Sequence, residues 1–497
     1  TSSMSMISHT LAGVLAAEIQ DLPLLTRLGE TFSAASEQLY LVGGCVRDLL
    51  MRRAVNDYDL ATSAHPDRIV KLLGSTHPEA LYTIGKRFGT ISARYPLGTV
   101  EITTFRRDRY LPGDRHPEVE FAPGIEDDLV RRDLTINSMA ADLASGDLID
   151  PAGGVSDLRQ GIIRVTGDAR QRFEEDPLRL LRVVRFAVQL EFDLASGLRQ
   201  ELLDSASLLQ QISRERIRDE LNKILLSAQP GRGLRLMVDL DLARWFCIDL
   251  LDLKNINTPD EASTNADGRM RVPAGARMKN LFEHVIQVVD NSPPRLVARL
   301  AALFHDIAKP RTFSFNNGEV HFFGHDTVGA RMTRRILADL RYDQETIELV
   351  SRLVELHMRQ ASNTDEWSER AVRRFVHTVG VETLDPLLTL ARADITSSNP
   401  RRVQKHLGRL DRLIERCDEL IAAEGAEEVV SPLDGNELMM LAGRGPGRWI
   451  QPIKEALLEM VLDGELARDD KAGAWEAARR LVADQERAAD APGAVPG

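Results

Sequence analysis

The spacing of apolar and polar residues changes character along the chain. Between residues 38 and 105, short segments rich in β-branched residues alternate with turn residues, which predicts a mixed β-sheet. The predicted strands lie in QLYLVGG, DYDLAT, GTISARY and TVEITTF. Residues 1–37 form a polar start followed by a helix. From about residue 168 the apolar residues recur at helical spacing, so we expect an α+β fold with a small mixed sheet followed by all-α regions.

Shifts in composition divide this fold into segments. A chain of 497 residues is too long for one domain. Residues 106–130 are polar and rich in Pro and Gly, which predicts a mobile loop, and a last strand is expected near 162–166. We expect the following segments: an N-terminal helical segment (1–37), a mixed-sheet head (38–167), a helical neck (168–253), a linker (254–277), a second helical domain (278–400), a C-terminal helical region (401–485) and a disordered tail (486–497).

Charge and cysteine content restrict the functional classes. The formal net charge is −12, so sequence-independent attraction to nucleic acid is disfavoured for the chain as a whole. Any nucleic-acid contact must then come from local basic patches. The three cysteines are scattered without a CxxC spacing, which is typical of a reducing cytoplasm and argues against cysteine-bound zinc. No apolar run approaches the ~18 residues that a membrane span needs, and we expect neither a signal peptide nor a membrane partner.

The stretch from Gly43 to Asp59 carries the first candidate site. In YLVGGCVRDLL an apolar strand meets two glycines and then a helix, an arrangement in which backbone amides can hold a phosphate. Asp57 and Asp59 are at i and i+2 of a predicted strand and therefore face the same side. Two carboxylates beside a phosphate cradle predict a site for two Mg²⁺ ions. The alternative is a plain turn followed by solvated acids.

Several motifs in the first half of the chain resemble one enzyme family. LVGGCVRDLLMRRAVNDYDLAT resembles the active-site signature of class II tRNA nucleotidyltransferases and the related bacterial poly(A) polymerases, which share a superfamily with DNA polymerase β. The motifs RRDLTINSMA, DPAGGVSDLRQGIIR, EEDPLRLLRVVRFAVQ and SRERIRDEL resemble the motifs that follow in that family, in the same order. The resemblance covers about residues 38–225.

The resemblance implies a role for each matching residue. Asp57 and Asp59 would hold Mg²⁺ and be catalytic. The nucleotide would be bound by Gly43, Gly44, Arg47, Arg132, Asp133, Asp176, Arg179, Arg182 and Arg185. Among these, the glycines and Arg47 would contact the triphosphate, and Arg132 and Asp133 would lie near the ribose.

Base selection would fall to the pair Asp176 and Arg179. At i and i+3 they are expected on one helix face. The carboxylate accepts from an exocyclic amino group and the guanidinium donates to a ring nitrogen or carbonyl. Cytosine and adenine both offer this pattern, whereas uracil and guanine would leave the buried carboxylate unsatisfied.

Three further residues of the head and neck have open interpretations. Arg182 and Arg185 continue the helix face and would reach phosphates, or instead form a basic surface that binds RNA or pairs with acidic residues. Glu101, in VEITTF, is either a third carboxylate near the metal ions or a strand-edge glutamate.

A second series of polar residues lies in the predicted helices between 278 and 398. Burial of the ionised aspartate in LAALFHDIAKP requires a partner or a metal. The order H…HD…H…H…D resembles the HD-type metal-dependent phosphohydrolase domain. The resemblance implies that His284, His305, Asp306 and Asp394 bind one metal, that His325 and His357 serve a second metal or the substrate phosphate, and that Lys309 contacts phosphate. Imidazole with carboxylate suits Mn, Fe, Ni, Co or Zn. The alternative is a domain that keeps the fold and no longer turns over.

Together these observations predict a template-independent nucleotidyltransferase that adds CCA to tRNA from CTP and ATP, with possible hydrolysis at the second site. No protein partner is evident. Basic stretches at 106–110 and 399–416 are candidate contacts to the tRNA backbone, or solvated helix faces. The rival functions are a poly(A) polymerase, an enzyme that adds only CC or only A, and a phosphohydrolase whose head merely binds RNA.

Overall fold

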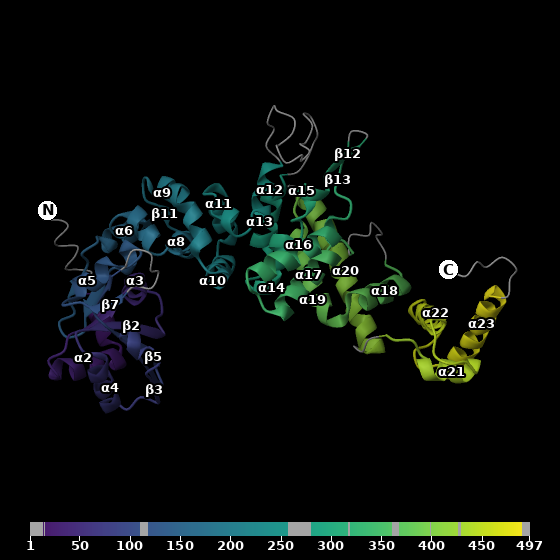
Figure 1. Cartoon of the computed structure of the whole chain (residues 1–497), viewed down its shortest axis with the longest axis horizontal. Coiled ribbons are helices and arrows are strands. Elements are labelled where there is room, and N and C mark those ends of the chain that lie inside the picture. Colours follow the sequence, from purple (N-terminus) through teal and green to yellow (C-terminus); the bar gives the residue numbers. More distant parts are fainter. Residues whose placement is uncertain are drawn as a thin grey trace. The chain divides into compact units, whose positions relative to one another are not determined.

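A computed structural model describes residues 13, 15–109, 118–256, 280–316, 319–359, 367–397, 399–425 and 429–489. The chain forms two compact units, Thr1–Leu251 and Asp252–Gly497 (Figure 1). In the first unit a mixed sheet is followed by short helices, and the second unit is almost entirely helical, so the expected α+β class is confirmed.

A seven-stranded sheet forms the centre of the head. Its strand order is β3-β4-β5-β2-β1-β8-β9, and β2 and β5 are parallel whereas the other neighbours are antiparallel. The strands are β1 (Leu39–Val42), β2 (Asp57–Thr62), β3 (Ala80–Tyr82), β4 (Thr90–Tyr95), β5 (Gly98–Thr104), β8 (Ala140–Asp142) and β9 (Leu148–Ile149).

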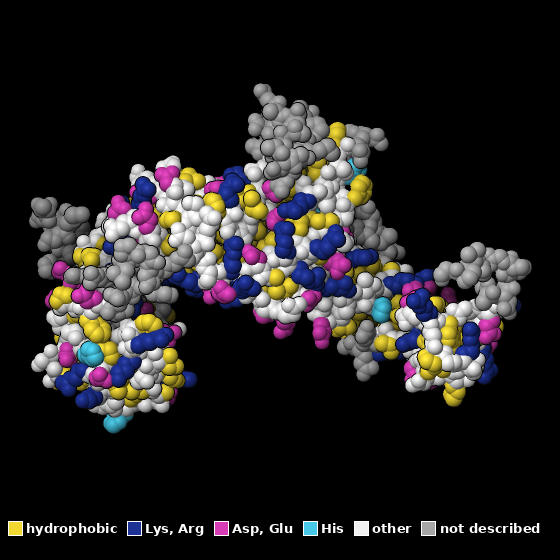
Figure 2. Space-filling view, viewed as in Figure 1, with side chains coloured by type: hydrophobic (Ala, Val, Ile, Leu, Met, Phe, Trp, Pro, Cys, Tyr) yellow, Lys and Arg dark blue, Asp and Glu magenta, His cyan; other side chains and the backbone are white. Residues whose placement is uncertain are grey.

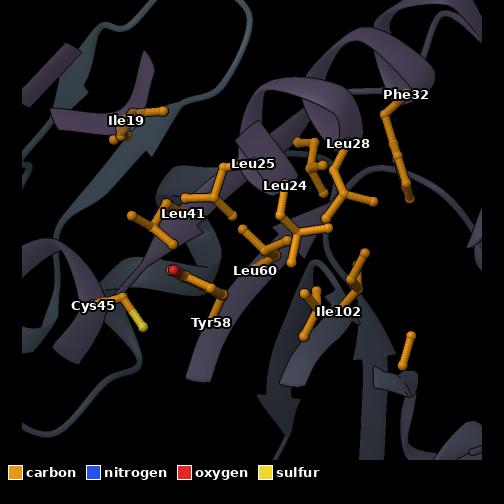
Figure 3. Packing of buried hydrophobic residues seen from close by; sticks show 14 of the residues in the cluster. Ile19, Leu24, Leu25, Leu28, Phe32, Leu41, Cys45, Tyr58, Leu60 and Ile102 are labelled. Carbon is orange, nitrogen blue, oxygen red and sulfur yellow. The ribbon is translucent and has the colours of Figure 1, made fainter. Parts of the chain in front are cut away.

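Both faces of this sheet are covered near its centre. Helices α2 (Pro23–Ala34), α3 (Gly44–Leu50) and α4 (Pro66–Ser75) supply Leu, Ile and Phe side chains to the larger core, which Figure 3 shows from close by. Strand β1 is buried on both faces: Leu39 and Leu41 enter the larger core, while Tyr40 and Val42 enter a smaller core with α5 (Ile125–Val130). This alternation follows from the two-residue period of a strand.

Two predictions in the head need correction. The helix expected after the polar start is interrupted at residues 21–22, because Pro23 lacks an amide hydrogen and begins a new helix, α2. The stretch 106–130 is not a loop throughout: β6 (Arg106–Arg109) pairs with β7 (Glu118–Phe121), and α5 follows. Residues 110–117 lie outside the described part of the chain. Near the predicted last strand, 162–166, the structure has β10 (Ile162–Ile163), preceded by α6 (Gly154–Gln160).

The neck packs helices against one another. They are α7 (Ala169–Glu175), α8 (Arg179–Leu190), α9 (Leu198–Ser205), α10 (Arg214–Leu225), α11 (Pro230–Asp239) and α12 (Asp249–Asn255). Helix α8 is largely buried and contacts both α10 and α11. A short strand that the pattern did not predict, β11 (Asp193–Leu194), pairs in parallel with β10 and so ties the neck to the end of the head.

The second unit begins with helices around a polar centre and ends with a small bundle. The helices are α13 (Leu281–Asn291), α14 (Leu296–Phe304), α15 (Lys309–Thr312), α16 (His325–Asp339), α17 (Gln344–Leu356), α18 (Glu369–Val379), α19 (Val381–Asp394), α20 (Pro400–Glu424), α21 (Gly435–Ala442), α22 (Ile450–Leu462) and α23 (Lys471–Ala489). A hairpin of β12 (Ser314–Asn316) and β13 (Glu319–His321) interrupts them.

The expected linker and tail differ from the structure at their edges. Helix α12 extends through Asn255, inside the predicted linker 254–277, and residues 257–279 lie outside the described part of the chain. Helix α23 continues to Ala489, past the predicted limit of 485, and residues 490–497 lie outside it as well. Among the helices that are described, none is long and apolar enough to cross a membrane.

Candidate active site and candidate metal centre

The glycine pair forms a tight turn between β1 and α3. Gly43 has a φ of 67°, a conformation that glycine adopts at little cost, and its amide donates to the Met139 carbonyl at 3.0 Å. A Cβ at Gly43 would lie 2.7 Å from Nη1 of Arg132. The glycine therefore permits both the turn and the close approach of an arginine to the start of α3.

Arg47, one turn into α3, is held in a fixed orientation. Its Nη1 donates to Asn137 Oδ1 at 2.7 Å, and its Nε and Nη2 each donate to the Asp48 carboxylate at 2.9 Å. The guanidinium carbon lies 5.3 Å from the ring centre of Phe186 in the neck. An arginine expected to contact the triphosphate is thus already ordered by the chain itself.

Three carboxylates share one face of the sheet. Tyr58 and Leu60 of β2 enter the core, so Asp57 and Asp59 project to the opposite face, where both are exposed. Glu101 of the parallel neighbour β5 stands in register with Asp59. Of the two interpretations of Glu101, the structure favours a third carboxylate beside the aspartate pair.

The clustered negative charge is visible in the pKa values. Partial burial raises the pKa of Asp59, nearby Arg132 opposes this, and Asp57 raises it further. The pKa of Glu101 is raised by partial burial first and by Asp59 second. This repulsion is the kind that a divalent cation relieves, and all the donors are oxygen atoms, which Mg²⁺ prefers.

Arg132 and Asp133 begin the next motif. Buried Asp128 accepts from Arg131 at 2.7 Å and from Arg132 at 2.9 Å, which aims both arginines at the cleft. Burial alone would raise the pKa of Asp128, but the two arginines outweigh burial and lower it. Asp133 lies among the cleft residues, yet its Oδ2 accepts from Nε of Arg182 at 2.7 Å. In this structure the carboxylate expected near the ribose therefore holds the neck helix α8.

The base-selecting pair is placed differently from the prediction. Asp176 and Arg179 do not share a helix face, because α7 ends at Glu175 and α8 begins at Arg179. Pro177 disfavours helical backbone at the residue before it, and Asp176 is accordingly extended, with a φ of −144°. Both side chains nevertheless line the same cleft.

Other residues of the neck hold this pair in place. Oδ2 of Asp176 accepts from Nη2 of Arg216 in α10 at 2.9 Å. Arg179 is buried and donates to the Glu175 carboxylate at 2.9 Å and to the Arg131 carbonyl at 3.2 Å. The motif SRERIRDEL thus contributes a direct contact to Asp176, the aspartate predicted to select the base.

For Arg182 and Arg185 the structure shows the alternative interpretation, pairing with acidic residues. Arg182 pairs with Asp133, and Nε of Arg185 lies 3.1 Å from Oε2 of buried Glu220 in α10. Arg182 still lines the cleft, and its guanidinium lies over the Phe186 ring.

One cleft of about 480 Å³ in the first unit collects these groups. It is lined by Gly44, Arg47, Asp59, Arg106, Arg131, Arg132, Asp133, Asn137, Asp176, Arg179, Arg182 and Phe186. The sequence reasoning did not single out Arg131, Asn137 or Phe186, and it named Arg106 only as part of the basic stretch 106–110. Asn137 links two other cleft residues, because its Oδ1 accepts from Arg47 and its Nδ2 lies 3.3 Å from Asp133 Oδ1.

The second unit brings its polar series together in one place. We call these residues the histidine–aspartate cluster: His284, His305, Asp306, His325, His357 and Asp394. They form two groups whose ligand atoms converge within 4.8 Å, one of His284, His305 and Asp394 and the other of Asp306, His325 and His357. All six predicted residues therefore meet, although they come from five separate positions in the chain.

The inner atoms of the cluster lie close to one another. Nε2 of His284 is 3.0 Å from Oδ1 of Asp394 and 3.4 Å from Nε2 of His305. Nε2 of His325 is 3.2 Å from Nε2 of His357. Asp306 stands between the two groups, and its buried Oδ1 makes no hydrogen bond.

Hydrogen bonds at the outer nitrogen fix the tautomers. In three of the histidines Nδ1 lies 2.6 to 2.8 Å from a backbone carbonyl: His305 with Ala302, His325 with Phe322 and His357 with Val354. A carbonyl only accepts, so Nδ1 carries a proton, and each ring in its neutral form directs a bare Nε2 inward. Converging acceptor atoms at these distances repel one another unless a cation or a proton stands between them. The cluster therefore fits a divalent metal held by imidazole and carboxylate.

The pKa values of the cluster reflect the same crowding. Burial alone would lower the pKa of His305, but adjacent Asp306 outweighs burial and raises it to about 9. Burial, followed by the charge of His305, lowers the pKa of His357 to about 4. Asp306 is buried, but His305 and Lys309 hold its pKa well below the usual range. Lys309 donates to Oδ2 of Asp306 at 2.6 Å, so the lysine predicted to contact phosphate lies at the cluster.

Comparison with protein families agrees with this geometry. Residues 39–164 match the model described as the Poly A polymerase head domain. Over these residues the head is similar to that family. Residues 191–249, next to it, match a probable RNA- and SrmB-binding site of polymerase A, and residues 277–422 match the HD domain. The histidine–aspartate cluster lies within the HD match.

Two curated proteins that this chain resembles are named CCA-adding enzymes. The chain is 39% identical to the CCA-adding enzyme of Lactobacillus helveticus (strain DPC 4571) over 226 residues, which are 45% of this chain and 54% of that protein. It is 40% identical to the CCA-adding enzyme of Bacillus subtilis (strain 168) over 225 residues, again 45% of this chain and 54% of that protein. The chain thus aligns with about half the length of these relatives.

Solved structures of CCA-adding enzymes share the fold. The Bacillus stearothermophilus CCA-adding enzyme in complex with CTP is 23% identical with a TM-score of 0.64, covering 94% of this chain and 97% of that chain. The Thermotoga maritima CCA-adding enzyme complexed with tRNA is 20% identical with a TM-score of 0.55, covering 95% of this chain and 98% of that chain. At these identities the likeness establishes the fold.

Proposed function

We propose that this protein adds CCA to the 3′ end of tRNA from CTP and ATP, with release of pyrophosphate. The observation that carries the proposal is the single cleft that holds Asp59, with Asp57 and Glu101 on the same sheet face, together with the pair Asp176 and Arg179. Chemistry and base selection are thereby within reach of one nucleotide. The names of the similar proteins, CCA-adding enzymes, support the same activity.

Different residues of the cleft would bind the triphosphate and the metal ions. The turn at Gly43 and Gly44, with Arg47, would bind the triphosphate at the start of α3. Asp57, Asp59 and Glu101 would hold the divalent ions, Mg²⁺ in our proposal, that supply positive charge for activating the tRNA 3′-hydroxyl and stabilising the departing pyrophosphate. The hydroxyl oxygen forms a bond to the α-phosphorus, and the bond from that phosphorus to the bridging oxygen breaks.

Base choice would come from the protein alone. The Asp176 carboxylate accepts from the amino group of cytosine or adenine, and the Arg179 guanidinium donates to the neighbouring ring acceptor. Because Arg216 already donates to Asp176, one lone-pair region of this carboxylate is occupied and its orientation is fixed. Asp133 contacts Arg182 in this structure, so its proposed role at the ribose requires a shared or exchanged contact.

A poly(A) polymerase is the nearest rival, since it shares the head. The net charge of −12 argues against sequence-independent RNA binding, and with it against this rival. The test is an incubation of the full chain with Mg²⁺ and a tRNA lacking CCA, given CTP, ATP or both. Two additions with CTP and a stop at three with both support the proposal. Long adenosine tails with ATP alone would instead support the rival, and additions limited to CC or to A a partial enzyme.

We further propose that the histidine–aspartate cluster hydrolyses phosphoesters. The unpartnered Oδ1 of Asp306 and the inward Nε2 atoms fit transition-metal binding. One ion would be held by His284, His305, Asp306 and Asp394, and a second ion or the substrate phosphate by His325 and His357. A bound ion would supply positive charge that activates a water molecule. Lys309, beside Asp306, would bind the substrate phosphate. Phosphate release from 2′,3′-cyclic and 3′-phosphorylated nucleotides, measured with Mn, Fe, Co, Ni or Zn, tests this activity. No release with any of these ions would leave the cluster a structural remnant.

The proposed place of action is the reducing cytoplasm. All three cysteines are buried, and none of them forms a disulfide.

A further inference from the structure

The strand that carries Asp57 and Asp59 extends past its neighbour. On one side β2 pairs with β5 over its whole length, from Asp57 to Thr62. On the other side the register with β1 stops at the pair Leu41 and Leu60, because β1 gives way to the glycine turn. The backbone groups of β2 that face this side before Leu60 therefore have no strand to bond with.

The Cys45 side chain bonds to these backbone groups in place of a strand. Its thiol donates to the Asp57 carbonyl at 3.3 Å, and its Sγ accepts from the Asp59 amide at 3.3 Å. In a parallel ladder one residue bonds the carbonyl of residue i−1 and the amide of residue i+1 of the neighbouring strand. Cys45 reproduces this pattern around Tyr58 with one sulfur atom. Its side chain is 6% exposed, and Figure 3 labels it beside the core that contains Tyr58.

This contact joins two parts of the site. Cys45 lies in the first turn of α3, next to the glycines that would bind the triphosphate, and the two aspartates are the proposed metal ligands. The two backbone atoms that the sulfur holds belong to the residues whose side chains carry the carboxylates. A free strand end would let the separation of the carboxylates fluctuate, and small displacements at a reacting centre cost large factors in rate.

We propose that Cys45 is a positioning residue for nucleotide addition: it completes the ladder of β2 and fixes the two aspartates relative to the triphosphate turn. The inference rests on the proposed roles of Asp57 and Asp59. It predicts that a side chain with one donor and one acceptor at this depth is required, rather than sulfur chemistry. Serine should therefore replace cysteine better than alanine does.

The test combines amide exchange with kinetics on the full chain. Cys45→Ala should speed hydrogen exchange of the Asp59 amide, while the amides of Leu60 and Ala61 keep their protection. It should lower kcat for CTP addition about 10- to 100-fold, as losses of outer-shell partners do, and raise the Mg²⁺ concentration for half-maximal rate. Cys45→Ser should restore most of both. Cys247→Ala, a buried cysteine of the same unit that does not line the cleft, is the control and should change neither.

The outcomes separate this inference from the proposed function. Unchanged exchange at Asp59 in Cys45→Ala, or a kcat and Mg²⁺ requirement within twofold of the parent, overturns the positioning role. A Cys45→Ser variant as impaired as Cys45→Ala overturns it too. If Cys45→Ala does not fold, Cys45→Ser against Cys247→Ala carries the comparison. A parent protein that adds no nucleotide overturns the proposed function, and the exchange measurement still tests the ladder.

Discussion

The two candidate sites use aspartate in opposite ways. In the head, Asp57 and Asp59 are exposed on a sheet face, and Asp59 lines a cleft that also contains several arginines. In the second unit, Asp306 is 1% exposed and enclosed by imidazoles whose outer nitrogens are fixed by backbone carbonyls. An exposed oxygen site suits an ion that arrives and leaves with its nucleotide, whereas a buried imidazole site suits a resident ion.

The arginines sharpen this contrast. Four arginines of the cleft already have a carboxylate or carbonyl partner, namely Arg47, Arg132, Arg179 and Arg182. The cleft therefore offers preorganised positive charge, which lowers the cost of orienting a triphosphate. The histidine–aspartate cluster instead offers lone pairs, which only a cation can use. The cleft therefore fits a nucleotide, and the histidine–aspartate cluster fits a metal ion.

The largest expected effect is the loss of one activity without the other when a single aspartate is replaced. Asp59→Ala should abolish nucleotide addition, with a loss beyond the about 100-fold that follows removal of an outer-shell partner, because a proposed metal ligand itself is removed. Phosphoester hydrolysis should persist. Asp306→Ala should have the reverse effect. Both activities, measured on each purified variant, check this, and a variant that loses both activities while folded would contradict the independence of the sites.

Metal content should show the next largest effect. His325→Ala removes one ligand of the group with Asp306 and His357, so protein dialysed against Mn²⁺ or Zn²⁺ should retain less ion by mass spectrometry. His321→Ala is a matched control four residues away, where the imidazole stacks on Phe323 rather than joining the cluster. Equal loss in both variants would mean that the ion is held elsewhere.

The free energy of unfolding of the metal-free protein should depend on pH, because the neighbouring histidines His305 and His357 have shifted pKa values. Between about 4, the folded pKa of His357, and the ordinary 6.5, the unfolded chain binds a proton that folded His357 does not, so stability rises with pH. Between 6.5 and about 9, folded His305 keeps a proton that the unfolded chain loses, so stability falls. The urea midpoint after chelation should therefore peak near pH 6.5.

With metal added, the urea midpoint should no longer fall between pH 6.5 and about 9. A bound ion needs neutral imidazole, so His305 no longer carries the extra proton when the ion is present. A metal-free midpoint that rises steadily from pH 6 to 9 would contradict the charge assigned to His305. His357→Leu should flatten the rising limb only in part, because burial also lowers the pKa of His284.

A smaller effect is expected on the preference for CTP over UTP when Arg216 is replaced. Arg216→Ala removes the hydrogen bond that orients Asp176, and hydrogen bonds to charged groups contribute about 1.5–3 kcal/mol. The preference for CTP over UTP should fall about 10-fold, which corresponds to the lower end of that range. Arg218→Ala is the control on the same helix, since Arg218 contacts Asp219 at 2.9 Å. Single-turnover rates with each nucleotide measure the preference. An unchanged preference in Arg216→Ala would show that Asp176 is oriented without it.

The sequence allowed the larger part of both sites to be anticipated. Adjacent motifs with a fixed local geometry, such as Gly43 with the two aspartates, could be placed because a strand has a two-residue period. Burial of the ionised Asp306 indicated that it needs a partner or a metal, and the order H…HD…H…H…D, which resembles the HD domain, grouped the six residues of the histidine–aspartate cluster. In both cases the constraint is local or chemical, and it does not depend on the detailed packing.

Contacts that depend on packing were not predictable in the same way. The helix face expected for Asp176 and Arg179 ignored the effect of Pro177 on the residue before it. The partners of Arg182 and Arg185 are 49 and 35 positions away in the chain, and spacing on one helix says nothing of them. Cys45 was missed because it acts on backbone atoms of another element, a role that carries no signature in residue type.

The smallest expected effect concerns the surface outside both sites. Figure 2 shows Lys and Arg side chains on the visible face of the second unit, and at the start of α20 Arg401, Arg402 and Lys405 are exposed. If α20 contacts tRNA phosphates, Lys405→Ala should weaken tRNA binding uniformly and reduce the slope of log affinity against log salt by about 1. Lys71→Ala, an exposed lysine on α4 of the head that does not line the cleft, should leave the slope unchanged. Binding titrations at several salt concentrations measure both. A slope that Lys405→Ala does not alter would assign α20 a purely solvated face, and the acidic chain would then have to recognise tRNA mainly through its first unit.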